Sequence, residues 1–112
     1  MKLLPNIAKY FAAEYNVILV LKNSPTIITD GKGFYINPTG RENLATIGSG
    51  DVLSGIIASL LSQTKEPLRS AIAGVYLHGK CGDVMYERTG DSSTIATDLI
   101  GLIPEIKNES LY

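Results

Sequence analysis

The sequence has little of what several classes of protein depend on. It contains one cysteine, Cys81, so no internal disulfide can form, and one histidine, His78, so no second imidazole is present to build a metal site or a catalytic triad. Ten Lys and Arg residues against eleven Asp and Glu residues give a net charge of −1, which argues against a nucleic-acid partner because phosphate binding needs a basic face. The longest apolar runs, near residues 17–21 and 56–61, are far shorter than the roughly 20 residues of a membrane span.

The amino terminus predicts no signal peptide, because polar and proline residues interrupt any continuous apolar stretch (Pro5, Asn6, Lys9 and Glu14). The small and apolar neighbours of Cys81 favour a buried thiol, and these features together predict a reducing, cytoplasmic setting. At 112 residues and 45% hydrophobic content, the chain has the size of one domain and is too apolar for intrinsic disorder.

Hydrophobic spacing predicts a short helix, a strand and a hairpin in the first part of the chain. Apolar residues recur at helical spacing within residues 3–14, as Ile7, Tyr10 and Phe11. The unbroken apolar run at residues 17–21 predicts a strand that is buried on both faces, as in a parallel sheet.

Two β-rich runs, residues 26–29 and 34–37, flank Asp30-Gly31 and predict a β-hairpin. After residue 50 the pattern becomes helical. We expect helices from Asp51 to about residue 63 and from Pro67 onward, and a third between about residues 94 and 103, followed by a polar tail at residues 107–112. Small residues along the second helix predict very close packing against a neighbour (Ala71, Ala73, Gly74, Gly79 and Gly82).

The stretch from Thr46 to Gly55, TIGSGDVLSG, carries the strongest chemical signal. Gly48 and Gly50 permit close backbone approach, and a helix begins directly after them, so their N–H groups predict an anion-binding nest that suits phosphate. Asp51 has two possible roles. It either caps the helix and complements its dipole, or acts as a base on a hydroxyl beside the bound phosphate.

Other polar residues also have two interpretations. Lys22, at the end of a predicted strand, is either a surface lysine whose stem covers apolar surface or a phosphate or nucleotide contact. For His78 we favour structural packing over a catalytic role. Asp83 and Asp98 are expected to cap or pair at helix ends.

Several ordered motifs resemble the ADP/ATP-dependent NAD(P)H-hydrate dehydratases of the ribokinase-like superfamily. They are INPTGRENLATIGSGDVLSGIIASLL, AIAGVYLHGKCGD and TIATDLIGLIP, with LKNSPTII upstream. The family pattern runs approximately T-G-N-P-G-M-A-T-G-G-S-G-D-V-L-T-G-I-I, and L-K-G-x-x-T-x-I before it. The resemblance covers residues 17–104. It implies an α/β, ribokinase-like three-layer αβα fold, of which residues 1–112 are the carboxyl-terminal part: strand, β-hairpin, phosphate loop, then helices.

The resemblance also implies an activity, the repair of hydrated NADH and NADPH. Phosphorylation of the ring hydroxyl by ADP or ATP, with Mg²⁺, would be followed by loss of phosphate, which restores the double bond. By this resemblance Asp51 contacts the hydrate and acts as base, and no side chain is assigned as a metal ligand. The residues expected to line the nucleotide pocket are Lys22, Asn23, Ser24, Pro25 and Thr26, and those expected to hold the transferred phosphate are Gly48, Ser49 and Gly50.

The sequence departs from the family pattern at a few positions. Asn23 and Ile47 replace glycines, Leu44 replaces Met, and residues 41–43 replace Asn-Pro-Gly. Leu has a volume close to that of Met and Asn tolerates positive φ, whereas Ile47 does not and predicts a loop of a different shape.

Two rival functions remain at this point: a ribokinase-like small-molecule kinase in which Asp51 deprotonates an alcohol, and a truncated, inactive binding or assembly remnant. The resemblance places further βαβ units outside this chain, so we expect it to turn over hydrate slowly or not at all by itself. The edge of the strand at residues 17–21 then needs a partner, either another copy in a homo-oligomer or the amino-terminal half of the domain. No membrane partner is expected.

Overall fold

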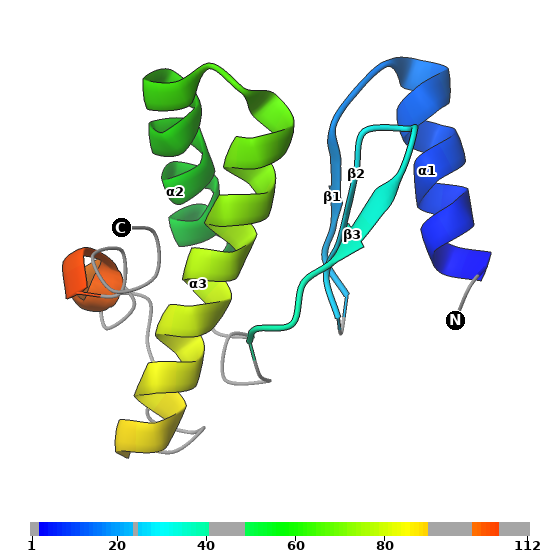
Figure 1. The fold of residues 1–112 in the computed structure, drawn as a ribbon. Helices are drawn as coiled ribbons and strands as arrows, with labels where there is room; N and C mark the ends of the chain where they lie inside the picture. The colour runs from blue at the N-terminus through cyan, green and yellow to red at the C-terminus, as the bar shows by residue number, and fades with distance from the viewer. Residues whose placement is uncertain (1–2, 24, 41–48, 90–99, 106–112) are drawn as a thin grey trace.

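The computed structural model describes residues 3–23, 25–40, 49–89 and 100–105. The helices are α1 (Leu3–Tyr15), α2 (Ser49–Thr64) and α3 (Pro67–Thr89), and residues 100–105 are also helical; the strands are β1 (Leu19–Leu21), β2 (Ile27–Thr29) and β3 (Phe34–Ile36). The three-stranded sheet lies between α1 on one side and the α2–α3 pair on the other (Figure 1). This arrangement is a helix–sheet–helix sandwich, as expected for an αβα fold.

The sheet has the order β1-β2-β3 and both pairs are antiparallel. The hairpin prediction is confirmed, with Ile28 opposite Tyr35. The prediction that the strand at residues 17–21 is buried on both faces is wrong. β1 is half-buried and pairs with β2 antiparallel, with Val20 opposite Ile28. Only five residues join the two strands, and a parallel partner would need a crossover of about a dozen residues or more.

The β2–β3 turn is built by Asp30. Its Oδ1 accepts hydrogen bonds from the backbone N–H groups of Lys32 (2.8 Å) and Gly33 (3.1 Å), and these bonds lower the pKa of the carboxyl. Gly31 adopts a φ of 92°, and a Cβ at this position would lie 2.7 Å from the Cα of Ala13. The turn therefore lies directly against α1, and glycine is required there.

The face that α1 buries consists of small residues. Pro5, Ala8 and Ala12 are buried, whereas the aromatic and aliphatic stripe seen in the sequence is exposed, with accessible fractions of 54% for Ile7 and 73% for Tyr10. The helix ends as predicted near Asn16, which has a φ of 53°. The N–H groups of Asn16 and Val17 return to the carbonyls of Ala13 and Ala12, which is the Schellman arrangement at a helix end.

Two apolar clusters make up the core of the described residues. The first joins the sheet to the α2–α3 pair and consists of Ile28, Leu53, Ala71 and Val75. The second lies between α2, α3 and the helical residues 100–105, and consists of Ile56, Leu77, Cys81 and Leu102. Cys81 is fully buried, as predicted, and burial raises the pKa of its thiol to about 11, so it stays protonated at neutral pH.

Close packing along α3 is confirmed at two glycines. A Cβ on Gly74 would lie 2.6 Å from Cγ1 of Ile57 on α2, and a Cβ on Gly79 would lie 2.0 Å from Oγ1 of Thr39 and 2.8 Å from its carbonyl carbon. At Gly79 the neighbour is thus the backbone that leaves β3, rather than a second helix.

The helix predictions after residue 50 are confirmed where the structure describes them. α2 begins at Ser49, two residues before the expected start, and α3 begins at Pro67 as expected. Residues 100–105 of the last helix are helical, while its cap near residue 94, Asp98 and the tail at 107–112 lie outside the described residues. Within the described ranges, no helix is both long enough and apolar enough to cross a membrane.

The contact at Gly79 predicts opposite effects for two Gly→Ala substitutions in helices. Gly79→Ala should lower the free energy of unfolding by about 1–3 kcal/mol, because backbone atoms of residue 39 must move. Gly55→Ala, in α2, should raise it by about 0.5–1 kcal/mol, because nothing lies within 4 Å of the added methyl group and alanine favours the helix. Urea unfolding followed by circular dichroism measures both, and equal effects would contradict the close approach.

Candidate functional site

Two positive features meet at the start of α2. Lys22 follows β1, and a Cβ placed on Gly50 would lie 3.1 Å from its Nζ, so the ammonium group sits against the first turn of α2. The first N–H groups of a helix have no intrahelical acceptor and carry partial positive charge. A lysine ammonium that lies beside a helix N-terminus favours an anion there.

Ser49, the first residue of α2, is joined to α3 by a buried polar pair. Its Oγ lies 2.9 Å from Nε2 of His78, and the accessible fractions of the two residues are 2% and 6%. Which of the two atoms donates depends on the tautomer of the imidazole. In either case the pair supplies each buried group with a hydrogen-bond partner that water cannot replace.

The surroundings of His78 lower the pKa of its imidazole below the ordinary value of 6.5. Burial is the largest cause, because it disfavours the charged form. A hydrogen bond with the backbone of Ser49 acts in the opposite direction, and the positive charge of Lys22 lowers the pKa further. His78 is therefore neutral at neutral pH.

The chain that leaves β3 is fastened to the same helix. Thr39 Oγ1 donates a hydrogen bond to the carbonyl of Tyr76 (3.0 Å), and the N–H of Gly40 donates to both carboxylate oxygens of Asp83 (3.1 and 3.2 Å). Asp83 thus binds the backbone of another segment rather than capping a helix end. α3 holds the chain on both sides of residues 41–48, which lie outside the described residues: Gly40 before them and Ser49 after them.

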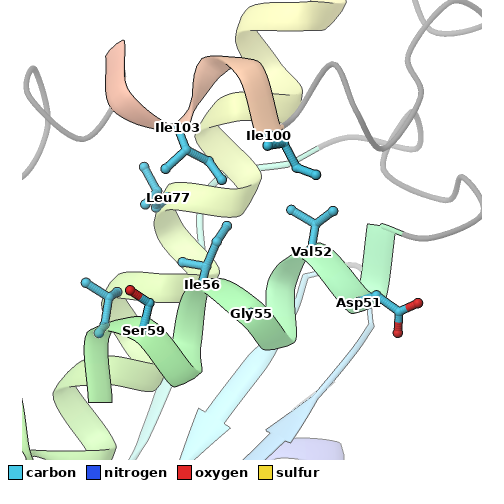
Figure 2. Close-up of a pocket in the computed structure, with 9 residues that line it drawn as sticks. Asp51, Val52, Gly55, Ile56, Ser59, Leu77, Ile100 and Ile103 are labelled. Atoms are coloured by element: carbon cyan, nitrogen blue, oxygen red, sulfur yellow. The ribbon is translucent and has the colours of Figure 1, made fainter. Parts of the chain in front are cut away.

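Asp51 is exposed in the first turn of α2 and lies at the rim of a cavity of about 440 Å³. The cavity lies between α2, α3 and residues 100–105. Its other lining residues are Val52, Gly55, Ile56, Ser59, Leu60, Leu77, Ile100 and Ile103. Figure 2 shows the side chains of Val52, Ile56 and Ile100 turned toward one another, while the carboxylate of Asp51 points away from them. The cavity is mostly apolar with one acidic residue at its rim, which is common among small-molecule sites.

Four of the nine residues predicted for the site lie together in the structure. Lys22, Ser49 and Gly50 meet at the start of α2, and Asp51 is next to them on the same turn. The remaining described residues follow β1: Asn23 is exposed, and Pro25 and Thr26 are half-buried. Ser24 and Gly48 lie outside the described residues. The stretches that the structure describes contain no group of three or more His, Cys, Asp or Glu side chains that could hold a metal ion.

His78 and Asp83 are the residues whose contact with this region the sequence reasoning missed. Both were interpreted as local packing or capping groups, yet they contact Ser49 and Gly40, the residues on either side of residues 41–48. The signal that could have found them is their spacing. His78-Gly79 and Gly82-Asp83 place two polar residues and two glycines on a buried part of α3. Polar residues beside glycines in a buried helix indicate that another backbone approaches closely.

Comparisons with known proteins place this geometry in a family context. Residues 2–105 match the family model described as NAD(P)H-hydrate dehydratase. The chain is 44% identical over 102 residues to the bifunctional NAD(P)H-hydrate repair enzyme Nnr of Moorella thermoacetica, covering 89% of this chain and 19% of that protein. It is 33% identical over 100 residues to the ADP-dependent (S)-NAD(P)H-hydrate dehydratase of Bacillus subtilis, covering 88% of this chain and 36% of that protein.

Solved structures give the same answer for the fold. The ADP/ATP-dependent NAD(P)H-hydrate dehydratase of Bacillus subtilis, co-crystallized with ATP/Mg²⁺, matches with a TM-score of 0.90 and 31% identity, over 96% of this chain and 39% of that one. A ribokinase-like superfamily protein of Enterococcus faecalis matches with a TM-score of 0.77 and 32% identity, over 90% and 35% of the two chains. The fold is therefore ribokinase-like, and the chain spans well under half the length of these relatives.

The buried imidazole predicts a pH dependence of stability. Since the pKa of His78 is below 6.5 in the folded state, the unfolded chain takes up this proton first, and the free energy of unfolding should fall as the pH falls below about 6.5. The slope contributed by one proton is at most about 1.4 kcal/mol per pH unit. Urea midpoints between pH 7.5 and 5.5 measure it. His78→Gln should flatten the curve in this window, and an unchanged curve would contradict a depressed pKa.

Proposed function

The chain belongs to the NAD(P)H-hydrate dehydratase family, and on that premise we propose that residues 1–112 carry the nucleotide- and phosphate-binding part of a hydrate dehydratase site. The reaction would transfer a phosphoryl group from ADP or ATP to the ring hydroxyl of hydrated NADH or NADPH. Loss of that phosphate, with loss of a ring proton, would then restore the double bond. The observation that carries the proposal is that the Lys22 ammonium lies beside Gly50, in the first turn of α2.

Phosphoryl transfer needs positive groups at this place because the phosphoryl group is anionic throughout the reaction. Phosphoryl transfer is catalysed mainly by positioning and by charge stabilisation. Lys22 would supply one full positive charge, and the N–H groups at Ser49 and Gly50 would supply fixed dipoles. The segment that follows Lys22, from Asn23 to Thr26, would line the nucleotide pocket, with Ser24 and Gly48 completing the two binding stretches.

Asp51 would serve as the base toward the hydroxyl of the hydrate. A carboxylate repels a phosphate beside it, so its value in this position lies in accepting a proton from a second, hydroxyl-bearing substrate. It is exposed and points away from the apolar cavity, so a substrate can reach it (Figure 2). The apolar cavity next to it suits the heterocyclic ring of a bound nucleotide.

Mg²⁺ would accompany the nucleotide. Mg²⁺ is commonly held by one or two carboxylates and by substrate phosphates rather than by an all-protein cage. The ion would neutralise part of the phosphate charge, while binding and orientation of the substrate would remain the task of the side chains around α2.

The wider setting is also part of the proposal. Large apolar side chains are exposed on α1 and along β3, among them Ile7, Tyr10, Tyr35 and Ile36. We propose that these surfaces are covered in the working protein, either by a second copy of the chain or by further parts of a ribokinase-like domain. The substrate is a small metabolite, and we propose that the protein acts in the cytoplasm.

ADP binding tests the role of Lys22. Lys22→Met should weaken ADP binding about 10- to 100-fold, because it removes a charge-assisted contact to phosphate. Lys32→Met removes the same charge from the exposed β2–β3 turn and should leave the affinity unchanged. Calorimetric titration measures both. Equal affinities for the two variants would contradict a phosphate site at Lys22.

A second measurement separates the proposed roles of Asp51. Asp51→Asn should leave ADP affinity equal or tighter, because a like charge is removed, and should abolish any NADH absorbance regained from the hydrate with ADP and Mg²⁺. Release of inorganic phosphate together with NADH identifies a dehydratase, whereas a kinase would leave the phosphoryl group on its alcohol. Unchanged turnover in the variant would leave Asp51 as a helix-dipole residue only.

A further inference from the structure

We propose that His78 is a positioning residue of this site: its imidazole holds Ser49, and through Ser49 the first turn of α2, where backbone N–H groups and the Lys22 ammonium face one anion. The identity of that anion, a nucleotide phosphate, rests on the proposed function. His78 is not itself placed against the phosphate, and its action passes through Ser49.

The Ser49–His78 hydrogen bond is buried. Ser49 and His78 are both nearly inaccessible to water, and their side chains lie 2.9 Å apart. A buried hydroxyl at the start of a helix that loses its partner cannot turn to water instead, so the pair fixes the distance between α2 and α3 at this end. Gly50 follows directly in the chain, and it is the residue against which the Lys22 ammonium rests.

α3 holds the chain both before and after residues 41–48. Thr39 and Gly40 are bonded to Tyr76 and Asp83, and Ser49 is bonded to His78. All three contacts come from residues 76–83, about two turns of one rigid helix. The residues on either side of residues 41–48 are therefore bonded to the same helix. His78 makes the one of these three contacts that reaches the first turn of α2.

His78 also interacts electrostatically with Lys22. The positive charge of Lys22 acts on His78, so a bound anion that offsets this charge must also act on the imidazole. The other titratable groups near this contact in the sequence are Asp51, two residues after Ser49 on α2, and Lys80, Cys81 and Asp83 on α3. None of these contributes to the shift, whose causes are burial, the Ser49 backbone and Lys22. Anion binding should therefore raise the pKa of His78, and by reciprocity protonation of His78 should favour the anion.

The experiment uses the fact that the chain has a single histidine, so one imidazole resonance reports its titration by NMR. In the free protein, the backbone amide resonances of Gly50 and Asp51 should shift with the same pKa as the imidazole. Those of Ser62 and Gln63, at the other end of α2, should not. Ser49→Ala should uncouple the two amides from the imidazole. Saturating ADP should raise the pKa of His78, and Lys22→Met should raise it in the absence of ADP.

Substitutions at position 78 complete the test. His78→Ala should weaken ADP binding about 10-fold, while His78→Gln, whose amide reaches Ser49 at a similar length, should restore most of the affinity. Cys81→Ala controls for packing: it removes a fully buried side chain one turn further along α3 and should leave ADP affinity unchanged. If the loss of affinity came only from a general loss of stability, His78→Ala and Cys81→Ala would weaken ADP binding alike. His78→Gln would then not restore the affinity.

Failure of the inference is distinguishable from failure of the proposed function. If the wild type binds ADP but the pKa of His78 does not move and His78→Ala binds normally, the inference is overturned and the proposed function stands. If the wild type does not bind ADP, the proposed function fails. The positioning role is then decided by the free protein: amides of Gly50 and Asp51 that ignore the titration of His78 overturn it, and amides that follow it support it.

Discussion

The approach of residues 37–40 to α3 is the constraint on which the arrangement around the start of α2 depends. The contact exists because residue 79 has no Cβ, and Thr39 occupies the space that a side chain would fill. Once Thr39 is there, its hydroxyl reaches the carbonyl of Tyr76 and the next N–H reaches Asp83. These contacts tie the chain after β3 to α3, and the Ser49–His78 pair ties the start of α2 to the same helix, although 12 residues of sequence separate Ile36 from Ser49.

α3 can serve as this support because it is buried on more than one side. Ala71 and Val75 pack against the sheet and α2, and Leu77 and Cys81 pack on the second cluster with residues 100–105. Apolar burial on both sides is the main source of rigidity in such a helix. The polar contacts of His78 and Asp83 then need only orient neighbouring segments, since they do not have to hold the helix in place.

The sequence was informative wherever the signal was local. Asp30-Gly31 between two β-rich runs predicted the hairpin, and Pro67 marked the start of α3. The buried face of α1 was not predictable in this way. Hydrophobic spacing favours Ile7 and Tyr10, but the hairpin turn at Gly31 comes so close to the helix that only its alanine face fits. Periodicity measures how apolar a face is and does not report how near another backbone will come.

The candidate site shows the same division. Motif resemblance located Lys22, Ser49 and Gly50, and the structure brings them together. The contacts that connect Ser49 and Gly40 to α3 join residues 29 and 43 positions apart in the chain, and spacing carries no information about such pairs. A lone histidine among small apolar residues is more often a packed core residue than part of a site, and nothing in the sequence says that its partner is Ser49.

The choice of an imidazole at position 78 follows from the charges around it. A lysine or arginine buried there would place a second permanent cation near Lys22, and its desolvation and repulsion would destabilise the folded state before any anion arrived. Histidine avoids this because burial, and then the positive charge of Lys22, lower the pKa of its imidazole and favour the neutral form. It can still bond to Ser49 in either protonation state: Nε2 donates in the charged ring and donates or accepts in the neutral one, and the serine hydroxyl can take the matching role. An anion at the proposed site would offset the charge of Lys22, and the imidazole would then regain its proton at lower cost.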